Sequence, residues 1–409
     1  MALPVTIEDV RAAAGRIADY VVRTPAVRAP ALAERCGANV WLKLETRQRT
    51  GSFKDRGAAN RLLQLTEAER KRGVIAMSAG NHAQAVAYQA TRLGIPATIV
   101  MPEPTPFTKV RRTEAFGAKV VLTGEGLAEA AEYAMRVAAE QNLTLVPPYD
   151  DARIVAGQGT AGLEFVNDVP DLDVLLVPVG GGGLIAGVAV AVKVLRPEIE
   201  VVGVQTEQYP SLRRVLDGLP PAHGGATIAE GIAVKSIGEI PLAIVRSLIS
   251  GVILVSEQAI EFAIHTLLEE EKLLAEGAGA AGIAALFESQ NRFRNRNVGI
   301  VVTGGNIDTG LLANVIMRVQ LQAGRVVRMR VGISDRPGVL AEVARIIGEC
   351  GANIIDVAHQ RLFGDVSSKN AELDITFEAR SPADLERIQV LLNDSGYSTS
   401  ILETTARAR

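Results

Sequence analysis

Short apolar runs alternate along most of this chain with longer segments of helical periodicity, and this alternation limits the folds it can adopt. The runs predict strands at residues 40–44, 74–77, 97–101, 119–122, 174–179, 201–205 and 298–303. Residues 81–93 and 127–141 have the apolar spacing of helices. Buried strands that alternate with helices predict an α/β fold with mainly parallel sheets, whose ligands bind beyond the carboxyl ends of the strands.

The pattern changes near residue 325, and the last part of the chain predicts a separate, smaller module. Its elements are a strand, a helix, two strands, a helix and a strand, at residues 326–333, 339–350, 353–361, 371–377, 382–393 and 397–402. This βαββαβ order is that of a ferredoxin-like module. A chain of 409 residues also exceeds what one hydrophobic core usually supports, so we expect two or three domains.

Composition and charge exclude several classes of protein. Apolar residues make up 48% of the chain and charged residues 22%, which is the balance of a globular protein. The net charge is −3 and the basic residues are scattered, so we expect no nucleic acid partner. The one basic run, Lys109 to Arg112, is most simply a solvated helix face.

The sequence also bears on where the protein works. No stretch has the length of a membrane span, and the first residues lack a signal-peptide pattern, so we expect no membrane partner. Cys36 and Cys350 have no C-x-x-C spacing, which argues against a disulfide framework or a zinc site. We therefore expect a cytoplasmic location.

The segment Thr50-Gly51-Ser52-Phe53-Lys54-Asp55-Arg56-Gly57 places one lysine at a glycine-flanked bend before a predicted helix. A lysine amine becomes nucleophilic where burial or nearby positive charge lowers its pKa, and Arg56 or the helix N-terminus would supply that charge. Lys54 is therefore a candidate for holding a cofactor as an imine. The alternative is structural: Ser52 caps the helix in the pattern Ser52-x-x-Asp55, and Lys54 is exposed.

Four glycines in succession, Gly180 to Gly183, follow the predicted strand at 174–179 and precede a helix. Backbone without side chains can surround a phosphate group with N–H donors, and the helix dipole favours the negative charge. A tight turn explains one or two glycines but not four, so phosphate binding is the favoured interpretation. The loop also matches the G-x-G-x-x-A pattern of a dinucleotide site, through Gly181, Gly183 and Ala186, with Glu207 after the next strand.

Two further motifs follow predicted strands. The first, Ser78-Ala79-Gly80-Asn81-His82, opens a helix, whose free N–H groups can bind an anion such as a substrate carboxylate. N-capping by Ser78 or Asn81 is its structural alternative. We interpret His82 as a structural or binding residue rather than a general base. The second motif, Thr303-Gly304-Gly305-Asn306, places a hydroxyl at the edge of the sheet, although Thr303 alone would be a turn residue.

In order and spacing, these four motifs resemble the fold-type-II enzymes that depend on pyridoxal 5′-phosphate, and among them the threonine dehydratase (threonine ammonia-lyase) and serine racemase branch. The resemblance covers about residues 5 to 320. It implies a tryptophan synthase β-like catalytic domain at 1–322, with a smaller subdomain around 45–150. It also implies β-elimination and deamination of L-threonine to 2-oxobutanoate and ammonia, and of L-serine to pyruvate.

The resemblance also implies a role for each matching residue. Lys54 resembles the Schiff-base lysine, which would also remove the Cα proton, and Phe53 resembles the residue that packs against the cofactor ring. Asn81 corresponds to the partner of the ring hydroxyl, and Thr303 to the hydroxyl beside the pyridine nitrogen. The phosphate cradle matches Gly180, Gly181, Gly182 and Gly183. The substrate is expected to bind at Ser78, Ala79, Gly80, Asn81 and His82.

Two departures from the branch narrow the expected chemistry. Serine racemases carry a second serine where Ala79 stands, and alanine cannot transfer a proton to the opposite face of Cα, so we expect poor racemisation. Racemase-like members bind a divalent cation around a carboxylate, but Gln205 and Ser211 occupy the matching positions, so no metal is expected. The segment 227–235 also resembles the dehydratases, and there Gly231 is either a close-approach glycine or a turn residue.

Beyond Arg325 the chain resembles ACT domains, small regulatory modules that often bind amino acids between paired copies. This assigns residues 325–409 to a regulatory domain, with His359-x-Arg361 near the end of its second strand. Paired modules predict a homodimer or homotetramer and allosteric control by an effector such as isoleucine or valine, as suits isoleucine biosynthesis. The D-x-P-G pattern is also that of a plain helix entry with proline in the first turn. The expected regulatory site consists of Asp335, Gly338, Asn353 and Ile354.

Three hypotheses of different classes remain: a pyridoxal-phosphate lyase, an NAD-dependent dehydrogenase that uses Gly181 to Ala186, and a non-catalytic amino-acid sensor built from the C-terminal module. The lyase is favoured because it alone explains the Lys54 segment together with the other motifs. Within the lyase class, serine racemase and 3-hydroxyaspartate dehydratase are alternatives, since substrate choice depends on the shape of the pocket.

Overall fold

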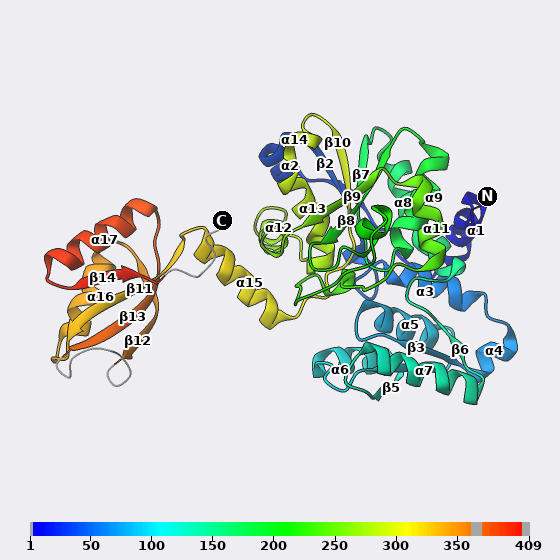
Figure 1. The fold of residues 1–409 in the computed structure, drawn as a ribbon, viewed down its shortest axis with the longest axis horizontal. Helices are drawn as coiled ribbons and strands as arrows, with labels where there is room; N and C mark the ends of the chain where they lie inside the picture. Colours follow the sequence, from blue (N-terminus) through cyan, green and yellow to red (C-terminus); the bar gives the residue numbers. More distant parts are fainter. Residues whose placement is uncertain (1–2, 361–369, 403–409) are drawn as a thin grey trace. The chain divides into compact units, whose positions relative to one another are not determined.

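The computed structural model describes residues 3–360 and 370–402, and the chain divides into two compact units, Met1–Ile307 and Asp308–Arg409 (Figure 1). The first unit contains a six-stranded and a four-stranded sheet, and the second unit contains a four-stranded sheet. Within the described ranges, none of the helices combines the length and the apolar character that a membrane span requires. Cys36 and Cys350 are both buried free thiols.

The six-stranded sheet has the order β1-β2-β10-β7-β8-β9, and every neighbouring pair is parallel except β1 with β2. Four of its strands were predicted to within one residue at each end, whereas β1 and β9 were missed. The strands are β1 (Ala26–Arg28), β2 (Asn39–Leu44), β7 (Val174–Pro178), β8 (Glu200–Thr206), β9 (Gly251–Val255) and β10 (Asn297–Val302).

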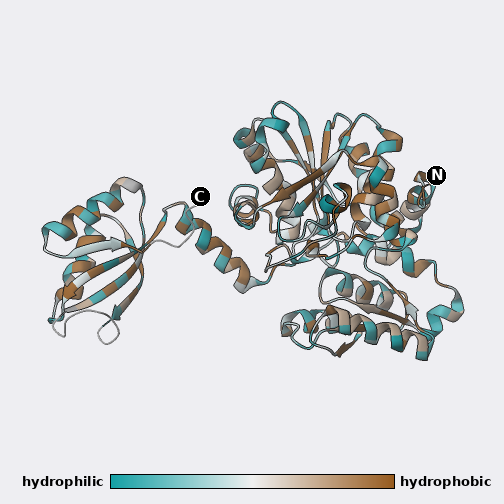
Figure 2. Ribbon diagram, viewed as in Figure 1, coloured by the Kyte–Doolittle hydropathy of each residue, from teal (hydrophilic) through white to brown (hydrophobic). Residues whose placement is uncertain are grey.

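Helix α9, Gly183–Leu195, is apolar on all sides and packs with α8, Ala152–Asp168, in the main hydrophobic core, because residues 183–192 are all buried. Apolar residues are concentrated on the strands of this sheet (Figure 2). The other helical segments of this part of the unit are α1 (Ile7–Ile17), α2 (Pro30–Cys36), η1 (Glu45–Arg47), α10 (Ser211–Leu216), η2 (Glu230–Ile232), α11 (Glu239–Leu248), α12 (Glu257–Glu269), α13 (Gly277–Glu288) and α14 (Gln290–Phe293).

The smaller sheet of the first unit is fully parallel, in the order β5-β4-β3-β6. Three of its strands match the predicted ranges at both ends, and the two-residue strand β6 was missed. Its strands are β3 (Val74–Met77), β4 (Ala97–Met101), β5 (Lys119–Leu122) and β6 (Thr144–Leu145). The accompanying helices are α3 (Lys54–Leu63), α4 (Glu67–Arg72), α5 (Asn81–Arg92), α6 (Phe107–Ala115) and α7 (Leu127–Gln141).

The second unit begins with helix α15, Thr309–Gln322, followed by strand, helix, strand, strand, helix and strand, the order predicted from the sequence. Its sheet is antiparallel, in the order β12-β13-β11-β14. The boundary between the units precedes α15, whereas the expected domain boundary follows it. The elements are β11 (Val326–Ser334), α16 (Val339–Glu349), β12 (Asn353–Gln360), β13 (Asn370–Glu378), α17 (Pro382–Asp394) and β14 (Ser398–Ile401).

The expected regulatory residues lie at two places in this unit. Asp335 and Gly338 are exposed between β11 and α16, and Gly338 has a φ of 92° as the residue before the helix. Because α16 begins at Val339, the proline of the D-x-P-G pattern precedes the helix, so the idea of a proline in its first turn is wrong. Asn353 and Ile354 open β12, and Arg361 of the His359-x-Arg361 motif lies outside the described residues.

Candidate active site

Lys54 is the first residue of α3, and a closed loop presents it. The Asp55 carboxylate accepts the Thr50 N–H at 3.0 Å and the Thr50 hydroxyl at 2.6 Å, which ties the two ends of the loop together. Ser52 does not cap the helix: its hydroxyl is buried and has no hydrogen-bond partner within the described part of the chain. The expected Ser52-x-x-Asp55 cap is therefore wrong, because Asp55 bonds backwards to Thr50 instead.

The amine of Lys54 is held inside the protein rather than on its surface. Its Nζ donates to the Pro148 carbonyl at 2.7 Å and lies 5.1 Å from the ring centre of Phe53. Burial lowers the pKa of Lys54 to about 8, and the nearby negative charge of Glu276 opposes this fall. Lys54 therefore has an unprotonated population near neutral pH, as a nucleophile or base requires.

Arg56 was expected to supply positive charge beside Lys54, but its charge is neutralised. The guanidinium is fully buried and forms hydrogen bonds of 2.7 to 2.8 Å with the carboxylates of Glu45 and Glu164. Burial and Glu276 account for the perturbed pKa of Lys54, with no contribution from Arg56. Arg56 thus joins α3 to η1 and α8, and the expectation that it activates the lysine by charge is wrong.

The Thr303 motif lies against the Lys54 loop. The Phe53 N–H donates to the Thr303 carbonyl at 3.0 Å, and the Gly305 N–H donates to the Gly51 carbonyl at 2.9 Å. Thr303 follows β10 and is buried, with 3% of its surface exposed. Segments that are 250 residues apart in sequence are thus paired like two short strands.

The loop before α5 leaves the start of this helix without a side-chain cap. Gly80 precedes the helix, and the Ser78 hydroxyl accepts the Gly80 N–H at 3.2 Å instead of an N–H of the first turn. Capping of the helix by Ser78 or Asn81 is therefore not observed. The first N–H groups of α5 remain suited to an anion beside Ala79.

The surroundings of His82 indicate a structural role rather than a catalytic one. It is buried, and its Nε2 lies 2.9 Å from the Val146 carbonyl, which can only accept, so this nitrogen carries the proton. Burial and then the positive charge of Lys54 lower the pKa of His82 to about 3. The imidazole is accordingly neutral near pH 7 and links α5 to the segment after β6.

Two polar residues to which the sequence predictions gave no role hold Asn81. The Asn81 amide Nδ2 donates to Glu276 Oε1 at 2.7 Å, and its Oδ1 accepts from Asn306 Nδ2 at 2.7 Å. Asn306 Nδ2 also donates to the Thr50 carbonyl at 2.7 Å. Glu276 precedes α13, and no sequence motif around it indicates a role at the site. Asn306 belongs to the Thr303 motif, and its amide side chain was the signal that could have indicated a hydrogen-bonding role.

The four glycines form the turn from β7 into α9, where their neighbours leave little space. A Cβ at Gly181 would lie 2.3 Å from the Tyr149 ring, and Gly182 has a φ of 93° that favours glycine. Tyr149 adjoins Pro148, so one segment contacts both the glycine loop and the Lys54 amine. The N-terminus of α9 has no side-chain cap and presents backbone N–H groups for an anion.

The segment around η2 borders the same region. A Cβ at Gly231 would lie 2.9 Å from Ala278 Cβ and 3.4 Å from Glu276 Oε1, so the close-approach interpretation of this glycine is confirmed. Glu230 forms an ion pair with Lys109 of α6. Lys109 is therefore more than part of a solvated face, because it connects the helices of the smaller sheet to η2.

Gln205 and Ser211, at the positions of the expected cation site, bond to each other. Gln205 Nε2 donates to Ser211 Oγ at 3.2 Å, and its Oε1 accepts the N–H groups of Leu212 and Arg213 at 3.0 Å. The amide thus caps α10. Across the described ranges, no three His, Cys, Asp or Glu side chains are grouped to hold a metal ion.

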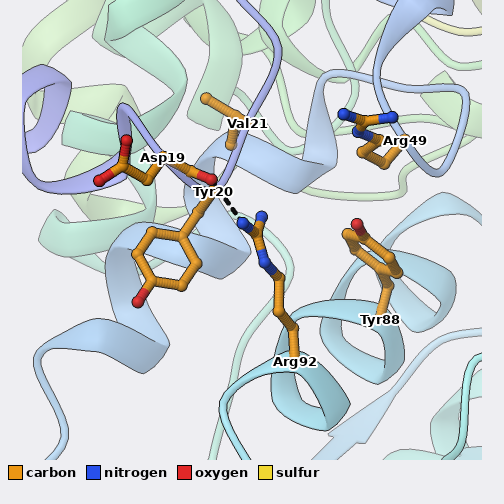
Figure 3. A pocket seen from close by; sticks show the side chains of 6 residues that line it. All are labelled: Asp19, Tyr20, Val21, Arg49, Tyr88 and Arg92. Atoms are coloured by element: carbon orange, nitrogen blue, oxygen red, sulfur yellow. Dashed lines mark hydrogen bonds between the residues drawn. The ribbon is translucent and has the colours of Figure 1, made fainter.

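A polar surface pocket of about 240 Å³ lies beside the α1–β1 connection (Figure 3). Arg92 crosses it and donates to the Asp19 carbonyl at 2.6 Å. None of the predicted site residues lines this pocket, so it is distinct from the cluster around Lys54. Its lining residues are Asp19, Tyr20, Val21, Arg49, Tyr88 and Arg92.

The cluster fits pyridoxal 5′-phosphate group by group. A lysine with a lowered pKa suits its aldehyde, an uncapped helix behind a glycine loop suits its phosphate, and an amide held on both sides suits its ring hydroxyl. An α/β unit whose partly buried lysine and glycine loop share the Pro148–Tyr149 segment has the features of a pyridoxal-phosphate enzyme. The chain belongs to the pyridoxal-phosphate dependent enzyme family, whose model matches residues 17–304, and its cofactor is pyridoxal 5′-phosphate.

Relatives named as threonine ammonia-lyases or dehydratases are similar over 76 to 98% of this chain. The L-threonine ammonia-lyase of Thermotoga maritima is 42% identical over 97% of this chain and 100% of its own length. That of Geobacter sulfurreducens is 39% identical over 98% and 100%. The catabolic L-threonine dehydratase TdcB of Staphylococcus aureus (strain USA300) is 42% identical over 76% of this chain and 92% of its own.

Solved structures are similar over about three quarters of the chain. Threonine deaminase isoform 2 of Solanum lycopersicum has a TM-score of 0.73 and 36% identity, over 76% of this chain and 91% of its own. Serine racemase of Dictyostelium discoideum has a TM-score of 0.70 and 33% identity, over 74% and 99%. Family membership thus favours the lyase class over the dehydrogenase and the non-catalytic sensor, and the chain is an enzyme.

Proposed function

We propose that this enzyme is a threonine ammonia-lyase, which eliminates water from L-threonine and deaminates the product to 2-oxobutanoate and ammonia, and which converts L-serine to pyruvate in the same way. The observation that carries the proposal is the convergence of Lys54, Asn81, Thr303 and the glycine loop, in a chain similar end to end to an L-threonine ammonia-lyase. Serine racemase and 3-hydroxyaspartate dehydratase are the alternatives within the class.

The residues that hold the cofactor follow from this arrangement. Lys54 would bind its aldehyde, Phe53 would pack beside the ring, Asn81 would donate to the ring hydroxyl and Thr303 would supply its hydroxyl to the ring nitrogen. The N–H groups of the glycine loop, Gly180 to Gly183, would bind the phosphate with the N-terminus of α9. When bound, the cofactor supplies an electron sink that stabilises negative charge at Cα.

Lys54 moves the proton in the proposed reaction. An amine with a pKa of about 8 can accept the Cα proton near neutral pH, and the Pro148 carbonyl, 2.7 Å from Nζ, holds the amine in place. The substrate carboxylate binds at the uncapped N-terminus of α5, beside Ser78, Ala79 and Gly80. His82 supports this helix through Val146.

Ala79 favours elimination over racemisation. A racemase needs an acid or base on each face of Cα, and alanine has no group that transfers a proton. The arrangement therefore supports one base, Lys54, on one face. The hydrogen bonds of Gln205 to Ser211 and to the start of α10 support a site without a divalent cation.

We also infer that residues 1–322 form the catalytic domain, with a smaller subdomain around 45–150, and that 325–409 form an ACT domain with a ferredoxin-like fold. The strand order β12-β13-β11-β14 with two helices supports this. An amino acid such as isoleucine or valine would bind at Asp335, Gly338, Asn353 and Ile354 and regulate the enzyme, as part of isoleucine biosynthesis in the cytoplasm. Pairing of these modules would give a homodimer or homotetramer.

The decisive experiment compares substrates and removes the lysine. Purified enzyme should release 2-oxobutanoate and ammonia from L-threonine with a higher kcat/KM than it shows for L-serine or 3-hydroxyaspartate. Lys54→Ala should lose the absorbance band of the lysine-bound cofactor, near roughly 410 to 420 nm, and lower kcat by at least about a thousandfold. Full activity in Lys54→Ala would refute the proposal.

Regulation has a separate test. Isothermal titration of the full chain with isoleucine and valine should give heat that Gly338→Val reduces, because a φ of 92° disfavours a branched residue. An absence of binding for every amino acid tried would contradict the ACT assignment and would leave the lyase assignment intact.

A further inference from the structure

Glu276 has a partly buried carboxylate that the proposed function does not use, and contacts fix its backbone. Its N–H donates to the Gly304 carbonyl at 3.0 Å, immediately after Thr303. The first turn of α13 packs closely against its neighbours. A Cβ at Gly277 would lie 2.4 Å from the Ile228 carbonyl, and a Cβ at Gly279 would lie 2.5 Å from the Gly304 carbonyl. The carboxylate is therefore held at one place relative to the Thr303 loop.

A directed chain of hydrogen bonds runs from the Lys54 loop to this carboxylate. Asn306 Nδ2 donates to the Thr50 carbonyl and to Asn81 Oδ1, each at 2.7 Å, which uses both of its hydrogens. Asn81 must then present its NH2 group to Glu276 Oε1, 2.7 Å away. If the Asn81 amide rotated by half a turn, its NH2 group would face the NH2 group of Asn306 and its oxygen would face the Glu276 carboxylate. Only the observed orientation therefore satisfies both hydrogen bonds.

We propose, on the basis of the proposed function, that Glu276 is a positioning residue that orients the Asn81 amide toward the cofactor ring. The charge of the same carboxylate then acts on the amine of Lys54. One N–H of Asn81 bonds to Glu276, and the other remains for the ring hydroxyl. Asn81 opens α5 of the smaller sheet, whereas Glu276 and Asn306 belong to segments of the larger sheet. The contact therefore also holds the two sheets together at the site.

Besides its own burial, groups on four segments shift the pKa of Glu276. Burial raises the pKa of Glu276 to about 7, the Asn81 hydrogen bond opposes this rise, the Glu230 carboxylate adds to it, and Lys109 and Lys54 oppose it. Glu276 therefore gains its negative charge as the pH rises through about 7. That charge favours the protonated form of Lys54, whose pKa burial alone would lower further.

Two variants of the full chain separate orientation from charge. Glu276→Gln keeps an oxygen that can accept a hydrogen bond from Asn81 but removes the charge. Glu276→Asp keeps the charge, but its side chain is shorter by one methylene, so the carboxylate lies farther from Asn81. The measurement is the rate of pyridoxal phosphate uptake by the cofactor-free enzyme as a function of pH, followed by absorbance, together with the equilibrium affinity for the cofactor. Uptake requires unprotonated Lys54, so the midpoint of the rate profile reports its pKa.

Glu276→Gln should move the midpoint down by roughly 0.5 to 1 pH unit and change affinity less than about twofold. Glu276→Asp should leave the midpoint in place and weaken affinity about tenfold, and it should add nothing further in an Asn81→Ala background. Glu140→Gln removes the charge of an exposed glutamate on α7 and should match wild type in both measurements.

An unchanged midpoint in Glu276→Gln, or an affinity loss that persists in the Asn81→Ala background, would overturn the inference. Neither measurement uses an amino-acid substrate. A failure of the lyase assignment would therefore appear as absent turnover of threonine with a normal uptake profile, and the two failures can be told apart.

Discussion

Replacement of Arg56 by methionine should destabilise the first unit severely, because it leaves a buried carboxylate without a cation. Arg56 and Glu45 both have fully buried side chains, and Glu164 is 14% exposed. Lys43 Nζ lies 2.7 Å from Glu164, so Glu164 retains a partner in the variant. Glu45 keeps the Thr24 hydroxyl, at 2.6 Å, and the Gln48 amide, at 3.2 Å, but no ion pair.

The size of the effect follows from this difference. Removal of one partner of a buried ion pair costs about 3 to 5 kcal/mol, because the other charge stays in a low-dielectric environment. The double variant Arg56→Met with Glu45→Gln removes that charge and should recover about 2 kcal/mol of the loss. Arg136→Met breaks an exposed pair with Glu140 and should cost less than about 0.5 kcal/mol.

The assay is urea unfolding followed by tryptophan fluorescence at a fixed, saturating cofactor concentration. The chain has one tryptophan, Trp41, which lies on β2 two residues before Lys43, so the signal reports this unit. A loss below about 1 kcal/mol in Arg56→Met, or no recovery in the double variant, would refute the reasoning.

The pH dependence gives a second check with a definite sign. Burial alone would raise the pKa of Glu45, but the charge and hydrogen bonds of Arg56 hold it below its ordinary value of 4.5. This contribution is present above pH 4.5 and is lost as the pH falls through the lower folded pKa. In Arg56→Met only the Thr24 hydrogen bond and the Lys43 charge still oppose burial, so the pKa of Glu45 rises, and the loss of stability should be full at neutral pH and shrink toward acid.

Two further variants test the site. Gly181→Ala would place a Cβ 2.3 Å from the Tyr149 ring and should weaken cofactor affinity at least about tenfold, measured by equilibrium titration. Gly15→Ala is the control, because no atom lies within 4 Å of the added Cβ, and it should leave affinity unchanged. Equal affinities of the two variants would contradict the packing argument. On the proposed arrangement, Ala79→Ser adds a hydroxyl on the second face of Cα and should raise racemisation of L-serine, measured by chiral chromatography; no increase would mean that the face assignment is wrong.

The elements with a strong local pattern could be predicted from the sequence. Helix α7 and strand β4 match their predicted bounds, because the apolar periodicity of each segment suffices to define it. The two-residue strand β6 and the edge strands β1 and β9 were missed, since pairing with neighbours rather than an apolar run defines them.

The errors at the site share one physical origin. Ser52 and Asp55 have the spacing of a cap, and Arg56 is a charge beside Lys54 in sequence, but the cap and the charge depend on partners elsewhere. Asp55 bonds to Thr50, and Arg56 bonds to Glu164, 108 residues away. The local sequence shows which hydrogen bonds and ion pairs a residue could form, and long-range packing determines which of them do form.

The residue types of the chain, read in order, were sufficient to propose Lys54 and the glycine loop as site residues and to name the cofactor, because each group of the cofactor needs a kind of backbone or side chain that leaves a local signature. Glu276 has no such signature, because the role of a single glutamate depends on the residues that folding brings into contact with it. The pairing of the Thr303 loop with the Lys54 loop brings Glu276 and Asn306 to the two sides of Asn81. Burial at that junction perturbs the pKa values of Lys54 and Glu276, and burial is a property of the packed fold.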